Sequence, residues 1–153
     1  GINDSKKLTE KKREALYDII LENASAWSVA SIDAEEIDKI NILNATHKAM
    51  NTAVNALSIK PDFVMIDGNS IKGMQVPHEC IVKGDANSMS IAAASILAKV
   101  SRDRYLIEMD RQYPEYGFAQ HKGYGTKAHV AALLKYGPCP LHRKTFLKKI
   151  LGK

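Results

Sequence analysis

The order of the predicted helices and strands indicates an α/β fold, in which helices pack on a sheet. Short apolar runs over residues 62–67 and 79–83 are typical of strands, because each is brief and is followed by turn residues. A long periodic segment, residues 88–112, follows them and is typical of a helix. No GxGxxG motif follows a strand and no P-loop is present, so a Rossmann or P-loop fold is not indicated.

The part of the chain before these strands is predicted to hold two helices and one further strand. Residues 9–23 have helical spacing, and Thr9 is a plausible N-cap. Residues 26–32 are predicted to form a strand. Residues 41–58 are predicted to form a second helix, which Pro61 ends because the residue before a proline is disfavoured in a helix.

The helix over residues 88–112 has small residues in its first turns, so it can pack close against a sheet, and Ser88 is its expected N-cap. A loop rich in glycine and aromatic residues follows over residues 113–125. A helix over residues 126–136 and a short basic helix from about His142 complete the predicted order.

Length and composition limit the classes of function. The chain has 153 residues, of which 45% are hydrophobic and 25% charged, as in an ordinary globular domain. No apolar run reaches the roughly 18 residues of a membrane-spanning helix, and the first residues do not resemble a secretory signal peptide. Cys80 and Cys139 form no CxxC pair, so we expect neither a zinc site nor a disulfide framework, and a cytoplasmic location.

The formal net charge of +5 weakly favours polyanionic partners. The basic residues gather near the start, between residues 122 and 135, and at the end of the chain. A solvated helix face and a phosphate contact explain any one of these groups equally well. The residues are Lys6, Lys7, Lys11, Lys12, Arg13, Lys122, Lys127, Lys135, Arg143, Lys144, Lys148, Lys149 and Lys153.

Two aspartates stand where the predicted strands end. Asp67 is the last residue of the first strand, and Asp85 follows the second strand just before the long helix. If the strands are neighbours, the carboxylates lie close together and repel each other unless a cation lies between them. Mg²⁺ prefers oxygen ligands, so a divalent-metal site is one hypothesis. The other is that each aspartate only forms a turn or caps a helix, and the spacing alone leaves both open.

Several segments together resemble bacterial ribonuclease HII, the type 2 ribonuclease H. The run KGDANSMSIAAASILAKVSRD, residues 83–103, is similar to the signature helix of that family. The segments NDSKKL at 3–8, IDGN at 66–69 and YGFAQHKGYGT at 116–126 resemble its DSK motif, its third-carboxylate strand and its C-terminal loop. The segment HRKTF at 142–146 resembles its end, so the match follows essentially the whole chain in order.

The resemblance implies a ribonuclease H-like mixed sheet flanked by helices. It implies a catalytic core over residues 1–125 and a C-terminal helical extension that binds substrate over residues 126–153. Family members begin with strands that carry an Asp-Glu-x-Gly-Arg-Gly motif, and no part of residues 1–153 matches it. Because the family uses four carboxylates, we expect this chain to be a fragment that is inactive alone, with a second chain as one source of the missing strands.

The function implied by the resemblance is that of a metal-dependent endonuclease with two Mg²⁺ or Mn²⁺ ions. It would hydrolyse the RNA strand of RNA–DNA hybrids and nick 5′ of ribonucleotides embedded in duplex DNA, leaving a 3′-hydroxyl and a 5′-phosphate. A fragment that binds nucleic acid without catalysis is the alternative. A relative of the fold with another phosphoryl-transfer or small-molecule task is a third reading. No membrane partner is expected.

The resemblance assigns roles to individual residues. Asp67 and Asp85 would be the catalytic metal ligands, and Tyr124 would recognise the substrate. The other candidate substrate-binding residues are Lys6, for a phosphate near the scissile bond, and Ser5, Lys83 and Lys122.

Three residues keep an alternative or structural reading. Tyr124 could instead be a loop aromatic that anchors the chain on the core. Asp103 is expected to be partly buried and paired with a base, because buried acids are usually paired, and the alternative is a place near the metals. His121 is expected to form hydrogen bonds within its loop, where it could help to order Tyr124.

Overall fold

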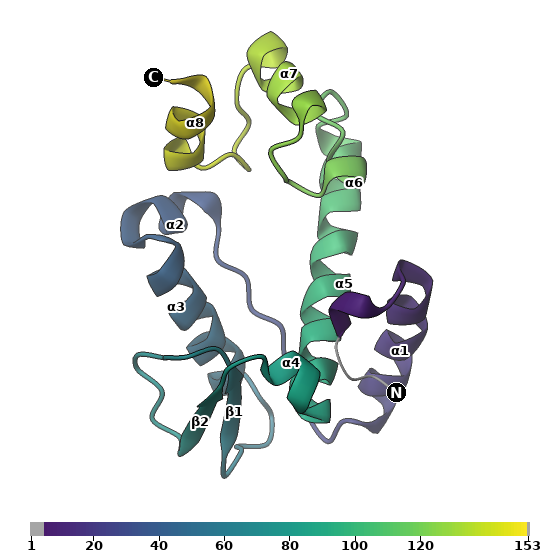
Figure 1. The fold of residues 1–153 in the computed structure, drawn as a ribbon, viewed down its shortest axis with the longest axis vertical. Helices are drawn as coiled ribbons and strands as arrows, with labels where there is room; N and C mark the ends of the chain where they lie inside the picture. The colour runs from purple at the N-terminus through teal and green to yellow at the C-terminus, as the bar shows by residue number, and fades with distance from the viewer. Residues whose placement is uncertain (1–4, 153) are drawn as a thin grey trace. The chain divides into compact units, whose positions relative to one another are not determined.

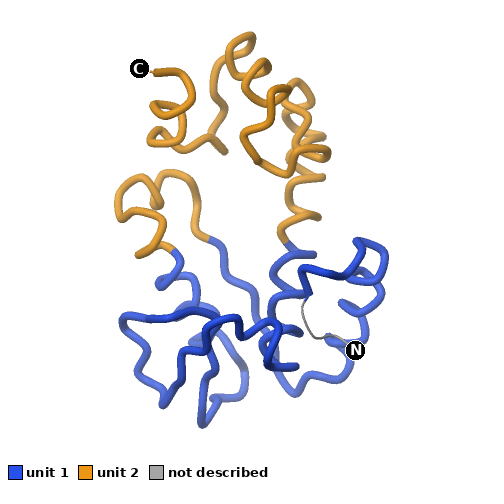
Figure 2. Tube along the Cα trace, viewed as in Figure 1, with its two compact units in different colours: residues 1–31, 46–101 blue, residues 32–45, 102–153 orange. Residues whose placement is uncertain are grey.

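The computed structural model describes residues 5–152. The chain forms two compact units, and Figure 2 colours them separately: unit 1 is residues 1–31 and 46–101, and unit 2 is residues 32–45 and 102–153. The predicted division into residues 1–125 and 126–153 stays a prediction. Figure 1 labels the helices and strands of the chain.

The sheet lies in unit 1, where two neighbouring strands run parallel. Strand β1 (Val64–Asp67) pairs with β2 (His78–Ile81), and Asp67 stands opposite Ile81. Strand β1 falls inside its predicted run, whereas β2 begins one residue before its predicted run and ends two residues before the end of that run. The pairing shows that the two strands are neighbours. Side chains alternate between the two faces of a strand, so Ile66 is 4% exposed while its neighbour Met65 is 41% exposed.

Two predicted helices begin within one residue of their predicted starts. Helix α1 (Glu10–Asn23) follows a short 3-10 turn, η1 (Ser5–Lys7), and is capped by the Thr9 hydroxyl, which accepts a hydrogen bond from the Lys12 N–H. Helix α3 (Ile42–Asn55) ends three residues before the predicted end.

The long helix α5 (Met89–Gln112) supplies residues to both units. The Ser88 hydroxyl accepts a hydrogen bond from the Ile91 N–H at 3.3 Å, which confirms Ser88 as its cap. The half of the helix in unit 1 buries Ala92 and Ile96 completely, because small residues in its first turns allow close packing. The short α4 (Gly84–Asn87) precedes it and was not predicted.

The predicted strand at residues 26–32 is wrong, because none of these residues is in a strand. The alternation of Trp27 and Val29 suits a pleated strand, but a strand also needs a partner for its backbone groups. Here the segment is tied to α3 instead, where the Ser28 hydroxyl donates a hydrogen bond to the Ala53 carbonyl. Trp27 and Val29 remain 47% and 40% exposed.

Unit 2 consists of helices. It contains α2 (Ala34–Ile40), the start of α3, the end of α5, α6 (Phe118–His121), α7 (Lys127–Tyr136) and α8 (Lys144–Leu151). The predicted helices over 126–136 and at the chain end are confirmed, whereas the short α2 and α6 were not predicted. The core of the unit is formed by Leu106, Tyr116, Phe118, Ala132 and Leu133.

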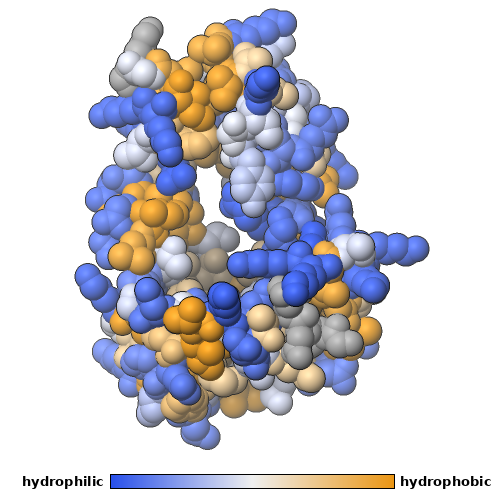
Figure 3. All heavy atoms as spheres, in the orientation of Figure 1, coloured by the Kyte–Doolittle hydropathy of each residue, from blue (hydrophilic) through white to orange (hydrophobic). Residues whose placement is uncertain are grey.

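Most of the face drawn in Figure 3 carries hydrophilic side chains, and exposed apolar side chains form smaller patches on it. Among residues 5–152, no helix combines the length and the apolar character that crossing a membrane requires.

Candidate functional site

A cavity of about 280 Å³ in unit 1 is lined by both predicted metal ligands, Asp67 and Asp85. Two predicted substrate-binding residues, Ser5 and Lys6, line the same cavity. The structure therefore brings together four of the residues that the sequence singled out. They come from η1, the end of β1 and α4, which are far apart in the chain.

The parallel pairing of β1 and β2 delivers the two carboxylates to one edge of the sheet. Asp67 ends β1 opposite Ile81, and the chain after β2 turns so that the Gly84 N–H donates to Asp67 Oδ1 at 3.0 Å. Gly84 is buried, and a Cβ there would lie 3.5 Å from the Asp67 Cα and only 2.6 Å from Ile91 Cδ1. A glycine at this position allows the turn before Asp85 to pass close to the strand end.

The Asp85 carboxylate is held by two hydrogen bonds from Ser5. The Ser5 N–H donates to Oδ1 at 3.1 Å and its hydroxyl donates to Oδ2 at 2.6 Å. Asp85 is only 5% exposed, and a buried carboxylate is costly unless such donors satisfy it. Ser5 and Asp85 are 80 positions apart in the chain, and Gly84 and Asp67 are 17 positions apart. These are not the local bonds of a turn former or a helix cap, so the geometry favours the paired-carboxylate reading.

The oxygen donors of this cavity fit a hard divalent cation. Each carboxylate oxygen has about two lone pairs, so the bonds from Gly84 and Ser5 leave acceptor capacity on both groups. Within residues 5–152, no three or more His, Cys, Asp or Glu side chains form a metal-binding group. Asp67 and Asp85 could therefore supply part of a coordination shell, of the kind that Mg²⁺ completes with water and phosphate oxygens.

Three cationic side chains, Lys6, Arg13 and Lys99, line the same cavity as the carboxylates. Arg13 Nη1 donates to the Leu8 carbonyl at 2.7 Å, and its buried Nε has no hydrogen-bond acceptor among the described residues. Guanidinium and ammonium groups bind phosphate oxygens, so the cavity presents both metal-ligand and phosphate-binding groups.

Sequence reasoning did not assign a site role to Ser95 or Lys99, which line this cavity, and it named Arg13 only within a basic group whose phosphate contact was left open. Ser95 and Lys99 are four residues apart on α5, so they lie on one face of the helix. Their place in the segment that contains Asp85 is the signal that could have identified them.

The other predicted substrate-binding residues do not line this cavity. Lys83 is exposed at the start of α4 with φ 56°. Tyr124 and Lys122 belong to unit 2, where Lys122 ends α6 with φ 54°. The Tyr124 side chain is 70% exposed, so it does not anchor its loop on the core.

The loop around Tyr124 is ordered by His121, as predicted. The Gly123 N–H donates to His121 Nδ1 at 3.0 Å, and the Tyr124 N–H donates to the His121 carbonyl at 3.0 Å.

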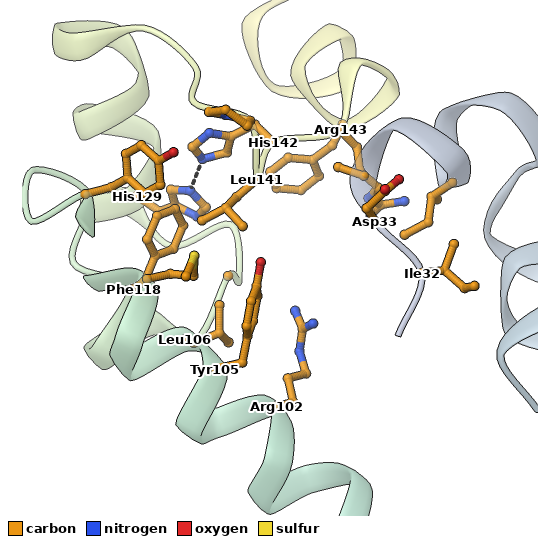
Figure 4. Close-up of a pocket in the computed structure, with 17 residues that line it drawn as sticks. Ile32, Asp33, Arg102, Tyr105, Leu106, Phe118, His129, Leu141, His142 and Arg143 are labelled. Carbon is orange, nitrogen blue, oxygen red and sulfur yellow. Dashed lines mark hydrogen bonds between the residues drawn. The ribbon is translucent and has the colours of Figure 1, made fainter. Parts of the chain in front are cut away.

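Asp103 is also buried as predicted, at 5% exposure. A larger cavity of about 420 Å³ lies in unit 2 (Figure 4), but it is lined by none of the predicted site residues.

Comparisons with known proteins show sequence similarity to one family. The sequence model of the ribonuclease HII family matches residues 1–149. Ribonuclease HII of Clostridioides difficile strain 630 is 54% identical over 151 residues, which are 99% of this chain and 59% of that protein. Ribonuclease HII of Caldicellulosiruptor bescii is 55% identical over 152 residues, 99% of this chain and 74% of that protein. The chain thus spans between about three fifths and three quarters of these relatives.

The fold is similar to that in the crystal structure of ribonuclease H2 from Pyrococcus horikoshii OT3. The TM-score is 0.80 with 26% sequence identity, covering 98% of this chain and 80% of that chain. This similarity confirms the predicted ribonuclease H-like α/β fold.

Proposed function

The chain belongs to the ribonuclease HII family, and from this premise we propose that it carries the active-site residues of a metal-dependent endonuclease. The proposed substrate is the RNA strand of an RNA–DNA hybrid, or a ribonucleotide embedded in duplex DNA. Cleavage 5′ of the ribonucleotide would leave a 3′-hydroxyl and a 5′-phosphate. The observation that supports this most is the single cavity that Asp67 and Asp85 share with Lys6, Arg13 and Lys99.

Asp67 and Asp85 would hold the metal, which we propose to be two Mg²⁺ or Mn²⁺ ions. When bound, such ions lower the pKa of a coordinated water and stabilise the leaving oxygen. The protein fixes the ligand geometry: the Gly84 N–H orients Asp67, and Ser5 orients Asp85 through both of its oxygens. Held this way, the carboxylates lose little freedom when the ions bind.

Basic and aromatic side chains would bind the nucleic acid. Lys6, at the carboxylate cavity, is suited to a phosphate near the scissile bond. We also propose substrate contacts for Ser5, Lys83 and Lys122. The exposed ring of Tyr124 is free to pack on a sugar or a base, and its hydroxyl can bond to a phosphate or a 2′-hydroxyl.

A cytoplasmic location remains part of the proposal. It is supported by Cys80 and Cys139, which are both free thiols.

The test compares Asp67→Asn and Asp85→Asn with Asp62→Asn, an exposed aspartate just before β1. The substrate is a DNA duplex with one ribonucleotide, assayed with Mg²⁺ or Mn²⁺, with and without a segment that carries the Asp-Glu-x-Gly-Arg-Gly motif. Loss of an outer-shell group costs about 10–100-fold, so removing a ligand should lower nicking by about 100-fold or more. Asp62→Asn should nick normally. Normal nicking by Asp67→Asn would show that the metal assignment is wrong.

The alternative, binding without catalysis, is supported by the cations of the cavity. It predicts that affinity for a hybrid duplex falls steeply as salt rises. If such binding is measured but no nicking occurs even with the added segment, the binding function replaces the catalytic one.

A further inference from the structure

Three histidines of unit 2 are buried against one another. His121, His129 and His142 are 8%, 2% and 8% exposed. The rings of His121 and His129 are stacked with centroids 3.9 Å apart, and those of His129 and His142 are 5.0 Å apart. They come from α6, from α7 and from the segment before α8, so they join three parts of the unit.

The hydrogen bonds of His142 fix which ring nitrogen carries its proton. The Cys139 N–H donates to His142 Nδ1 at 3.0 Å, so Nδ1 is an acceptor without a proton. The proton of the neutral ring is then on Nε2, which lies 2.8 Å from His129 Nε2 (Figure 4). His142 therefore donates to His129.

The bond from His142 also fixes which nitrogen of His129 carries its proton, and His129 in turn bonds to the backbone of Tyr124. Because His129 Nε2 accepts from His142, its own proton is on Nδ1, which donates to the Tyr124 carbonyl at 2.8 Å. The bonds thus run in one direction, from the Cys139 N–H through His142 and His129 to Tyr124.

His121 holds the other side of the same loop. Its Nδ1 accepts from the Gly123 N–H, so its Nε2 carries the proton and donates to the Tyr116 carbonyl at 2.7 Å. The Tyr124 N–H donates to the His121 carbonyl at 3.0 Å. The backbone of Tyr124 is therefore held through both its N–H and its C=O, while its side chain stays 70% exposed.

We propose that His142 and His129 are positioning residues that hold Tyr124 toward the nucleic acid through this directed chain of hydrogen bonds. The proposal rests on the proposed function, because it takes Tyr124 as a substrate contact. The buried histidines fix the backbone of Tyr124, from which the exposed ring extends. A side chain whose backbone is already fixed loses less entropy when it binds.

The chain of bonds exists only when the rings are neutral. A second proton on His142 would face the Cys139 N–H, and one on His129 would face the His142 Nε2–H. Burial, together with the neighbouring histidines, lowers the pKa of His142 to about 4, and burial also lowers that of His129. Both rings are therefore neutral near pH 7.

The groups around these rings do not favour a charged form strongly. Tyr116 and Cys139 contact the histidines directly, and Glu115 lies near both of these residues. The titratable or charged groups that share the unit 2 cavity with His129 and His142 are Asp33, Arg102, Tyr105, Tyr113 and Arg143. The pKa of His142 is lowered first by burial and then by the charges of His129 and His121, while the bond from the Cys139 N–H acts in the opposite direction.

The first test is the state of the three rings in the unmodified chain at pH 7, by ¹⁵N NMR of the imidazoles. We expect the proton on Nε2 of His121, Nδ1 of His129 and Nε2 of His142. A proton on Nε2 of His129 would reverse the bond from His142 and overturn the proposal.

The second test compares His129→Leu, which removes both hydrogen bonds, with His129→Asn, whose amide nitrogen can replace Nδ1 as a donor. We expect His129→Leu to speed amide exchange at Tyr124 and to weaken binding of a ribonucleotide-containing duplex by about tenfold, the effect of one lost hydrogen bond. His129→Asn should recover most of both. His47→Leu, which removes a buried histidine of unit 1, is the control and should not change the exchange at Tyr124.

The outcomes separate this proposal from the proposed function. If Tyr124→Ala binds duplex normally, the substrate role of Tyr124 is wrong, and the positioning proposal falls with it even where the ring states are as expected. If Tyr124→Ala weakens binding but His129→Leu changes neither exchange nor affinity, only the positioning proposal is wrong. If His129→Leu does not fold, the NMR measurement on the unmodified chain decides.

Discussion

The Ser5 hydroxyl donates a 2.6 Å hydrogen bond to Oδ2 of Asp85, and the Ser5 N–H donates to Oδ1 of the same carboxylate. One residue of η1 thus satisfies both oxygens of a buried group that lies 80 positions later in the chain. The orientation of Asp85 therefore depends on the short turn before α1 as much as on its own helix.

Replacing Ser5 with Ala should lower the free energy of unfolding by about 2 kcal/mol, because a buried carboxylate oxygen loses its hydroxyl donor while the backbone bond remains. Urea denaturation measures this change, and Mn²⁺ titration should show weaker binding. The matched control is Ser58→Ala at an exposed position of unit 1, which should change neither quantity. Equal stabilities of Ser5→Ala and Ser58→Ala would contradict the structural role of this bond.

Gly84→Ala should cost about 1–2 kcal/mol of unfolding free energy, because the new methyl would lie 2.6 Å from Ile91 Cδ1 and Ile91 is buried. Ile91→Val removes that Cδ1 atom. The double variant should therefore lose less stability than the sum of the two single variants, as neighbouring sites do when they share space. Chemical denaturation of all four proteins measures the coupling, and simple additivity would show that Ile91 does not limit the space at Gly84.

The central part of the fold could be predicted because its signals are local. A few neighbouring residues predict each of these elements. An apolar run that ends in Asp67 predicts a strand, and small residues after the cap Ser88 predict a helix that packs closely. The pairing of β1 with β2, which the sequence left open, is given by the structure, and it places Asp67 and Asp85 at one edge of the sheet.

The rest depends on contacts that a local pattern does not contain. The strand predicted at residues 26–32 has the right alternation but no partner strand in residues 5–152, so the pattern alone was insufficient. Ser95 and Lys99 were missed because only the helix packing shows that their face lines the carboxylate cavity. The bonds among His129, His142 and Tyr124 likewise need the tertiary structure.

Asp38 of α2 caps the start of α8. Its carboxylate accepts hydrogen bonds from the Lys144 N–H at 2.7 Å and from the N–H and hydroxyl of Thr145 at 3.2 and 2.8 Å. Arg143, the N-cap residue of α8, supplies no such side-chain bond. Desolvation raises the pKa of Asp38, but the bonds from Lys144 and Thr145 outweigh it and hold that pKa below 3.8.

Asp38→Ala should therefore loosen the first turn of α8, because two backbone N–H groups lose their acceptor. Amide exchange at Lys144 and Thr145 should rise several-fold. Asp38→Asn keeps one oxygen acceptor, so its amide exchange rates should lie between those of the unmodified chain and those of Asp38→Ala. Since the pKa of Asp38 is lowered, its contribution is present above pH 3.8 and is lost as the pH falls through the lower pKa of the folded state. Unchanged exchange in Asp38→Ala would contradict the cap.

Acid should destabilise the protein through His142. The pKa of His142 is about 4 in the folded chain and 6.5 when the ring is unperturbed, so the unfolded state binds more protons between these values. Stability should therefore fall as the pH drops from 6.5 toward 4. The lowered pKa of His129 acts in the same direction.

Urea denaturation at several pH values between 7 and 4.5 measures this slope. His142→Gln removes the titrating ring, so its unfolding free energy should depend less on pH than that of the unmodified chain. His78→Gln, at an exposed histidine of β2, should keep the full slope. If His142→Gln and His78→Gln give the same slope, His142 does not resist protonation in the folded state, and the neutral hydrogen-bonded chain from Cys139 to Tyr124 is not formed.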